Sequence, residues 1–221
     1  IENDPNISEV SHSLASNSLG VAAHVIGERA PAIAHFREAI TTTPDFAEAH
    51  ENLAQALLFE EEYEEAWLEY EWRWLNESNK QLKRHYNGPM WQGEKLANQT
   101  LLVHAEQGFG DVIQFVRLLS LIDSQGGKVI LACHAALIDL FSALPGIDSV
   151  VDIDQEIPPY DAHVPLLSLP RLLNISGTNI PNAAYLAANS AARDQDTSLL
   201  RVGIAWAGMP RHEFDPHRNR S

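Results

Sequence analysis

The stretch Thr100–Arg117, TLLVHAEQGFGDVIQFVR, joins a short apolar run to an amphipathic pattern through a turn that contains two glycines. The apolar run predicts a buried strand, and the apolar residues after Asp111 recur at helical spacing. Gly108 and Gly110 permit a tight turn and a close backbone approach. A strand that enters a helix this way leaves N–H groups free at the helix start, where they attract anions and oxygen-rich ligands. The stretch therefore predicts a strand–turn–helix unit whose turn carries a carboxylate.

Apolar runs and helical patterns alternate from residue 100 onward, which is typical of a mainly parallel sheet with helices on its faces. We expect strands near 100–105, 127–133, 149–152, 161–164 and 200–206, and helices near 111–124, 135–143 and 166–174. Ligands of such sheets bind outside the carboxyl ends of the strands. This rule places the turn Gly108–Asp111, His134 and the segment Asp161–His163 near the binding edge.

The first eighty residues repeat with a spacing of 34, because Gly20 returns as Ala54 and Phe36 returns as Tyr70. Small residues at these positions allow two helices to cross closely, and an aromatic residue on the second helix fills the space between them. The repeat predicts helices at roughly 8–27, 31–42, 46–59 and 63–76. One departure stands out: Arg73 replaces the small residue that the first unit has at Ala39.

Trp67, Tyr70 and Trp74 form one stripe on the last of these helices. Helical spacing of this kind favours a hydrophobic seam that docks the repeats onto the next domain. A platform on which sugars stack is the alternative. Residues 76–99 are polar and contain Gly88, Pro89 and Gly93, so we expect a linker that Trp91 anchors.

The net charge of −15 argues against binding to nucleic acid and to anionic membrane surfaces. Cys133 is the only cysteine, which excludes an intramolecular disulfide and favours a reducing compartment, the cytoplasm. No apolar run approaches the length of a membrane span. The chain opens without Met and ends soon after a further apolar strand, so we expect a piece of a longer protein.

Several local motifs have plainer interpretations. The turn is neither a dinucleotide fingerprint, because Ile113 stands at the third small position, nor a P-loop. Asp111 could simply cap a helix. The D-x-D pattern Asp152–Asp154 favours a solvated turn over a metal site, and His104 favours a core position. His212, Asp215 and His217 have metal-ligating side chains, but no further ligand cluster accompanies them, so we expect no metal.

Five segments together resemble a known family: WLEYEWRW, WQGEKL, LLVHAEQGFGDVIQFVR, YDAHVPLLSLP and VGIAWAGMPRHEFD. The series resembles bacterial tetratricopeptide-repeat (TPR) proteins that carry a glycosyltransferase domain. Their transferase part is similar to the lipopolysaccharide heptosyltransferases, and the plan of repeats plus transferase resembles the O-linked N-acetylglucosamine transferases. The resemblance covers about residues 16–221 and implies a GT-B fold, in which two Rossmann-like domains face a cleft.

The resemblance implies an α+α/β chain with four parts. These are TPR repeats over 1–78, a linker over 79–99, a Rossmann-like N-terminal transferase domain over 100–195, and the start of a nucleotide-sugar-binding domain over 196–221. The first domain would bind the acceptor, which is a protein or a glycan. The repeats would recruit that acceptor or a partner protein.

The resemblance also implies roles for single residues. Asp111 corresponds to the proposed general base, and Gly108, Gly110, Gln114 and His163 would line the acceptor cleft. The donor would be a nucleotide sugar, with no metal or other cofactor, and its site would include Trp206, Gly208, His212, Asp215, Arg220 and Ser221. Without the rest of the donor domain we expect this chain alone to be inactive. A non-catalytic TPR scaffold with a degenerate transferase domain is the rival hypothesis.

Overall fold

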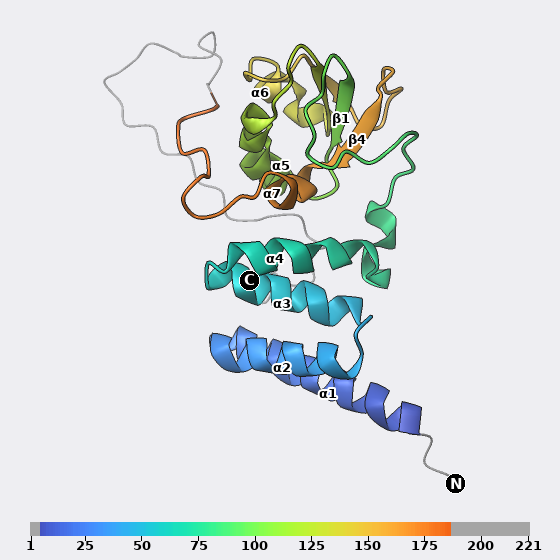
Figure 1. Ribbon diagram of the computed structural model, residues 1–221, viewed down its shortest axis with the longest axis vertical. Helices are drawn as coiled ribbons and strands as arrows, with labels where there is room; N and C mark the ends of the chain where they lie inside the picture. The colour runs from blue at the N-terminus through green and yellow to red at the C-terminus, as the bar shows by residue number, and fades with distance from the viewer. Residues whose placement is uncertain (1–4, 187–221) are drawn as a thin grey trace, which may run out of the picture. The chain divides into compact units, whose positions relative to one another are not determined.

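The computed structural model describes residues 5–186, apart from the side chains of residues 5–7 and 81–82. Four helices come first, and a four-stranded parallel sheet with short helices follows (Figure 1). The predicted α+α/β class is confirmed at this level. The expected strand at 200–206 lies outside the described residues. Within 5–186, no helix combines the length and the apolar character that crossing a membrane requires.

The four helices expected from the repeat are all present. They are α1 (Pro5–Val25), α2 (Arg29–Thr42), α3 (Ala47–Phe59) and α4 (Tyr63–Tyr70). The fourth is shorter than predicted, because a 3₁₀ turn, η1 (Glu71–Trp74), replaces its last turn. The Arg73 guanidinium donates to the Tyr70 carbonyl (3.1 Å), a carbonyl at the end of α4. Tightened final turns of this kind are common at helix C-termini.

Small residues sit where the helices cross, as the spacing predicts. Ala32, Ala54 and Ala66 are fully buried. At Gly20 a Cβ would stand 2.5 Å from the Phe36 ring, so only glycine lets α1 approach α2 this closely.

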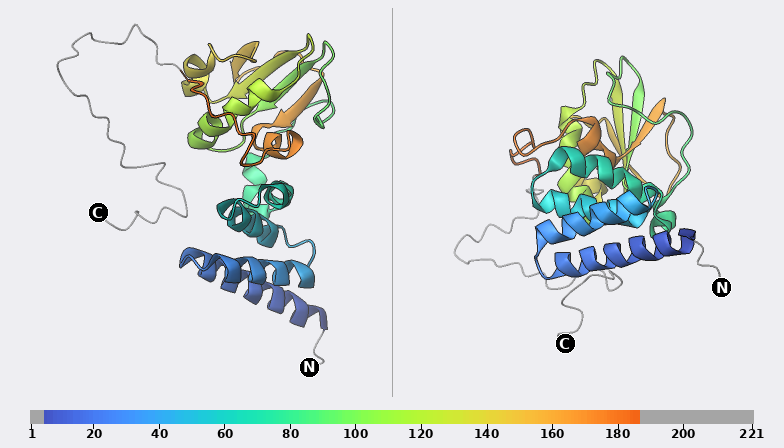
Figure 2. Two further views of the ribbon diagram at one scale, coloured as in Figure 1. Left: turned by 60° about the vertical axis from the view of Figure 1, so that its left-hand side comes forward. Right: turned by 60° about the horizontal axis from the view of Figure 1, so that its bottom comes forward.

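All four strands of the sheet run parallel in the order β3-β2-β1-β4. Their bounds are β1 Thr100–His104, β2 Lys128–Cys133, β3 Ser149–Asp152 and β4 Ala162–Pro165. The β1–β2 and β2–β3 connections advance in one direction, so right-handed crossovers place their helices on one face of the sheet. Figure 2 shows these helices together on that face.

The predicted helices of this region are broken into α-helical and 3₁₀ pieces. The pieces are α5 Phe109–Phe115 with η3 Val116–Leu121, η4 Ala135–Leu137 with α6 Ile138–Phe141, and η5 Leu166–Ser168 with α7 Leu169–Leu172. The amphipathic pattern therefore predicted which segments are helical, but not that each is part α-helix and part 3₁₀ helix. Helices this short are marginal by themselves and are stabilised by packing of one apolar face, a pattern that does not specify whether each turn is α-helical or 3₁₀.

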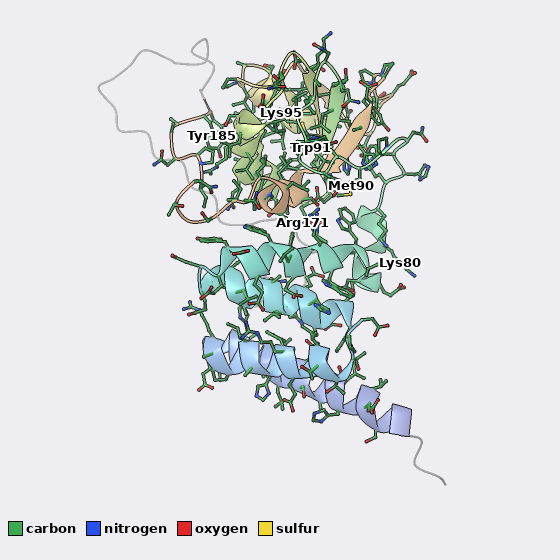
Figure 3. The ribbon with its side chains drawn as sticks, viewed as in Figure 1. Lys80, Met90, Trp91, Lys95, Arg171 and Tyr185 are labelled. Atoms are coloured by element: carbon green, nitrogen blue, oxygen red, sulfur yellow. The ribbon has the colours of Figure 1, made fainter. Side chains whose placement is uncertain are left out.

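The linker is anchored as expected. It begins with a 3₁₀ segment, η2 (Glu77–Leu82), and continues irregularly to β1. Trp91 is 2% exposed, and its backbone N–H donates to the carbonyl of His163 (2.9 Å). Met90 forms a parallel bridge with the same residue, so this part of the linker runs beside β4 (Figure 3).

The aromatic stripe of the last repeat helix docks onto the α/β core, which confirms the seam. The Trp67 ring meets the Phe115 ring of α5 edge-on, with 5.9 Å between centroids. Tyr70 packs against the same core. Because Trp67 is only 8% exposed, it offers no face for sugar stacking, and that alternative is wrong for this residue.

Candidate functional site at the carboxyl edge of the sheet

Parallel pairing brings the segments that follow β1, β2 and β4 to one edge of the sheet. His104 at the end of β1 pairs with Ala132 of β2 and with Pro165 of β4. The turn Gly108–Asp111 follows β1, and His134 directly follows β2. The predicted positions of the turn and of His134 are therefore confirmed, whereas the roles given to them remain predictions.

The turn itself is open rather than strained. Gly108 is the N-cap of α5 with extended backbone (φ −67°, ψ 172°), and a Cβ on Gly110 would meet no atom within 4 Å. Neither glycine is thus needed for a left-handed conformation, contrary to the tight turn that the sequence suggested. The glycines instead leave the surface above the turn uncovered, and both are exposed.

Asp111 occupies the third position of α5 and is half-buried. Its Oδ2 lies 3.6 Å from the point where a Cβ on Gly108 would stand, so the carboxylate folds back over the start of the helix. A carboxylate at this helical position commonly reaches back toward the N-cap backbone. The exposed Gln114 lies one helical turn beyond Gly110 and shares its face.

The segment that follows β2 also contacts the turn. The exposed Phe109 side chain lies against the His134 ring, with centroids 4.8 Å apart. His134 Nε2 also lies 3.4 Å from the carbonyl oxygen of Gln107, just before the turn. An aromatic ring, an imidazole and a carboxylate therefore occur along one short exposed edge, where a hydroxyl-bearing ligand could find both a stacking surface and a hydrogen-bond acceptor.

Glu106 is the residue that sequence reasoning missed. It follows β1 two residues before Gly108, and its side chain is 1% exposed. Its Oε1 accepts hydrogen bonds from Arg73 (3.0 Å) and from the Leu167 backbone N–H (3.2 Å). Two features of the sequence could have indicated this contact. Glu106 is a charged residue close after a buried strand, and Arg73 is a charged residue at a position of the repeat where the first unit has a small one.

Burial raises the pKa of Glu106 to about 7, although the adjacent Arg73 guanidinium opposes this rise. A carboxyl with such a pKa binds or releases a proton near neutral pH. Glu106 is enclosed by the elements that contact it, so it faces the protein interior and not the open side of the turn.

His163 does not lie where the sequence placed it. It is the second residue of β4 and pairs with Leu102 in the middle of the sheet, not at the end of a strand. Asp161 precedes β4 and accepts a hydrogen bond from the Thr100 backbone N–H (2.7 Å), at the opposite, amino edge. The expected place of Asp161–His163 at the binding edge is therefore wrong, because this segment forms the start of β4, whereas the binding edge is formed by the strand ends.

The His163 side chain belongs to a stack of rings. His104 Nε2 lies 3.4 Å from His163 Nδ1, and the Tyr86 ring from the linker stacks on His104 at 4.0 Å. Burial lowers the pKa of His104 to about 3, and burial also lowers the pKa of His163. His104 is 5% exposed, which confirms its predicted core position.

The remaining predicted residues give no site within the described chain. Asp152 Oδ1 accepts from the Asp154 backbone N–H (3.0 Å), and Asp154 pairs with Arg84 (2.7 Å), so the D-x-D pattern is a turn, as expected. Residues 5–186 contain no group of three or more His, Cys, Asp or Glu that could hold a metal ion. All six donor-site predictions lie outside the described residues: Trp206, Gly208, His212, Asp215, Arg220 and Ser221.

Comparisons with known proteins leave the family open. No protein-family model matches the sequence, and no curated protein does. Among solved structures, the chain is similar to a mutant of the Thermobaculum terrenum O-GlcNAc transferase, with 12% sequence identity and a TM-score of 0.30. The match covers 67% of this chain and 35% of that one, so this chain spans only about a third of that protein.

Proposed function

We propose that this chain carries the repeats and the acceptor-binding part of a glycosyltransferase. In this proposal the helices are TPR hairpins and the sheet belongs to the first domain of a GT-B fold. The observation that carries the proposal is the motif HAEQGFGD, which the sequence resemblance assigns to such enzymes. Its turn lies at the carboxyl edge of a parallel sheet, where ligands bind in folds of this class.

The proposed reaction is the transfer of a sugar from a nucleotide sugar to a hydroxyl group. The acceptor oxygen forms a bond to the anomeric carbon, the bond from that carbon to the phosphate oxygen breaks, and the nucleotide diphosphate leaves with the electron pair. Asp111 takes the proton of the attacking hydroxyl. Attack opposite to the leaving group inverts the anomeric configuration.

The exposed turn suits a hydroxyl acceptor. Gly108 and Gly110 leave the backbone accessible, and Gln114 offers an amide on the same helix face. In the proposal the donor is held by residues 206–221, and the repeats recruit a protein or glycan acceptor. The single, buried Cys133 suits a cytoplasmic protein.

A second candidate is a binding scaffold whose transferase domain is degenerate. The position of the Asp111 carboxylate favours it, because Oδ2 folds back over Gly108 as a helix-capping carboxylate does. In this case Asp111 stabilises α5 and transfers no proton.

The variant Asp111→Asn separates the two candidates. The protein that carries this chain is incubated with a panel of labelled nucleotide sugars and candidate acceptors, and transfer is measured by label incorporation. A general base contributes about a hundredfold to ten-thousandfold in rate. We expect transfer by the wild type, a loss of at least that lower size in the variant, and a similar melting temperature for both.

The matched control is Asp123→Asn, because Asp123 is an exposed aspartate that forms a surface ion pair with Lys95. It should transfer at the wild-type rate. Unchanged transfer by Asp111→Asn would remove Asp111 from the mechanism. If the wild type shows no detectable transfer and Asp111→Asn has a lower melting temperature than the wild type, the scaffold is favoured.

A further inference from the structure

Four buried or half-buried side chains form an ionic cluster beneath the turn: Glu71, Arg73, Glu106 and Ser168. Arg73 donates to Glu106 Oε1 (3.0 Å), to Ser168 Oγ (2.8 Å) and to Glu71 Oε1 (2.9 Å). Ser168 Oγ in turn donates to Glu71 Oε2 (3.1 Å). The cluster is therefore closed on itself through one guanidinium.

The four members come from three parts of the chain. Arg73 and Glu71 belong to η1 at the end of the second helical hairpin, Glu106 follows β1, and Ser168 ends η5 after β4. Arg171 of α7 stands beside the cluster, with its Nε 3.8 Å from Glu71 Oε2 (Figure 3). One arginine of the repeats thus contacts the segments that follow two strands of the sheet.

The guanidinium is fixed in orientation as well as in charge. It lies over the Tyr70 ring at 4.8 Å and over the Trp74 ring at 4.6 Å, and its residue is 1% exposed. An arginine held by flat rings and several acceptors has little freedom to turn. A buried ion pair is poor evidence for stability, because apolar residues of similar volume often do as well, but it does define a geometry.

The same hairpin holds the turn from both sides. Before the turn, Arg73 holds Glu106, which stands two residues ahead of Gly108. After the turn, Trp67 packs edge-on against Phe115, the last residue of α5. Between these two anchors, a Cβ on the exposed Gly110 would meet no atom within 4 Å, so no distant part of the described chain covers this point of the turn.

We infer that Arg73 is a positioning residue, which fixes the Gly108–Asp111 turn through Glu106, so that the second helical hairpin sets the geometry of the candidate site. The inference deepens the proposed function, because the positioned group is its proposed base. A change that shifts η1, such as capture of an acceptor by the repeats, would then alter the turn directly.

The test uses the double variant Arg73→Met/Glu106→Met, which leaves neither charge of the pair buried without its partner. Amide hydrogen exchange is followed at Val112, whose N–H donates to the Gly108 carbonyl. We expect exchange at Val112 about tenfold faster than in the wild type, while the urea midpoint changes little. The single variant Glu106→Gln keeps an oxygen that can accept from both Arg73 and the Leu167 N–H, so its exchange at Val112 should be as slow as in the wild type.

The matched control removes an exposed ion pair that joins the two hairpins, from α2 to α4, and does not reach the sheet: Arg37→Ala/Glu65→Ala. Val112 should exchange at the wild-type rate in this variant. Wild-type exchange at Val112 in the Met/Met variant, at an unchanged urea midpoint, would overturn the inference, as would equally fast exchange in the control.

A kinetic arm separates this inference from the proposed function. If the wild type transfers sugar, the Met/Met variant should lose about tenfold in kcat with little change in the KM of the donor. Faster exchange at Val112 in a protein that transfers no sugar would leave the positioning role intact and refute the function alone. Unchanged kcat with unchanged exchange would refute the positioning role.

Discussion

The two helical hairpins use the same spacing but end against different neighbours. In the first, Ala39 of α2 is fully buried, and its carbonyl accepts a hydrogen bond from Ser13 of α1. In the second, the residue at the equivalent position is Arg73, which is equally buried but reaches the carboxyl edge of the sheet. A repeat position that serves helix packing in one unit thus serves an ionic contact with another element in the next.

This difference shows where a repeat array changes into part of another domain. In the first hairpin, Ala32 and Phe36 belong to a buried cluster whose described members all come from the helices α1–α4. The second hairpin places Trp67 and Tyr70 against the core of the α/β part. The second hairpin therefore has two sets of partners, and substitutions in it should affect the sheet as well.

Exchanging the residue types between the hairpins should have the largest effect. Ala39→Arg would place a guanidinium at a fully buried position where α1 packs on α2. We expect a loss of about 4 kcal/mol in the free energy of unfolding, measured by urea denaturation, because burial of a charge and overpacking act together. A loss below about 1 kcal/mol would mean that the two positions tolerate arginine equally.

Low pH should destabilise the part of the fold that contains the sheet more than it destabilises the first hairpin. The folded-state pKa of His104 is about 3, below its ordinary value of 6.5, so the unfolded chain binds a proton first as the pH falls. Stability from His104 is complete above about pH 6.5 and declines as the pH falls from there toward about 3. His104→Phe keeps a ring against Tyr86 and should remove this part of the decline.

The raised pKa of Glu106 acts in the opposite sense, because its contribution is complete below pH 4.5 and is lost as the pH rises through about 7. The free energy of unfolding is measured by urea denaturation at each pH for wild type and His104→Phe. Their difference is free of the Glu106 contribution, since both proteins contain Glu106. His12→Gln, at an exposed histidine of the first hairpin, is the control. An identical acid decline in wild type and His104→Phe would contradict the expectation.

Substitutions where the helices of each hairpin cross should have smaller effects on stability. Gly20→Ala would place a Cβ against the Phe36 ring, and we expect a loss of about 1 to 2 kcal/mol in thermal unfolding despite the better helix propensity of alanine. Ala54→Gly, at the equivalent position, should lose about 1 kcal/mol through propensity and packing. If Gly20→Ala raises the melting temperature, the close approach of α1 and α2 is not limiting.

The smallest effect is expected at the exposed ion pair. Arg37 donates to Glu65 at 2.8 Å, but both side chains are about half exposed, at 53% and 44%. Arg37→Ala should cost no more than about 0.5 kcal/mol in urea denaturation, since solvent and salt screen such pairs. A loss as large as that expected for a buried pair would show that exposure does not separate the two kinds of contact.

Much of the fold follows from patterns that extend over several residues. The spacing of Gly20 with Ala54 and of Phe36 with Tyr70 predicted the hairpins, and the apolar runs predicted four of the strands. The turn after β1 could be placed at the carboxyl edge because parallel sheets bring strand ends together. These features depend on local periodicity, which a single sequence displays.

Features that depend on distant partners could not be predicted. Glu106 has its role only because Arg73, 33 residues earlier, reaches it in the folded chain. The strand near 161–164 was predicted to within one residue of β4, but His163 was placed at the wrong end of it, because the apolar run around His163 continues into η5 and gives no sign of where pairing ends. The Asp161 contact with Thr100 fixes the start of β4, and it joins residues 61 apart.

The claim on which these comparisons depend is that the second hairpin belongs with the sheet. Native-state hydrogen exchange at increasing urea concentration tests it directly, by comparing amides of α1, α4 and β1. Amides of α4 and β1 should merge into one unfolding isotherm, while those of α1 open at lower free energy. If amides of α4 instead merge with those of α1 and open independently of β1, the hairpins form one unit and the anchoring by Arg73 is refuted.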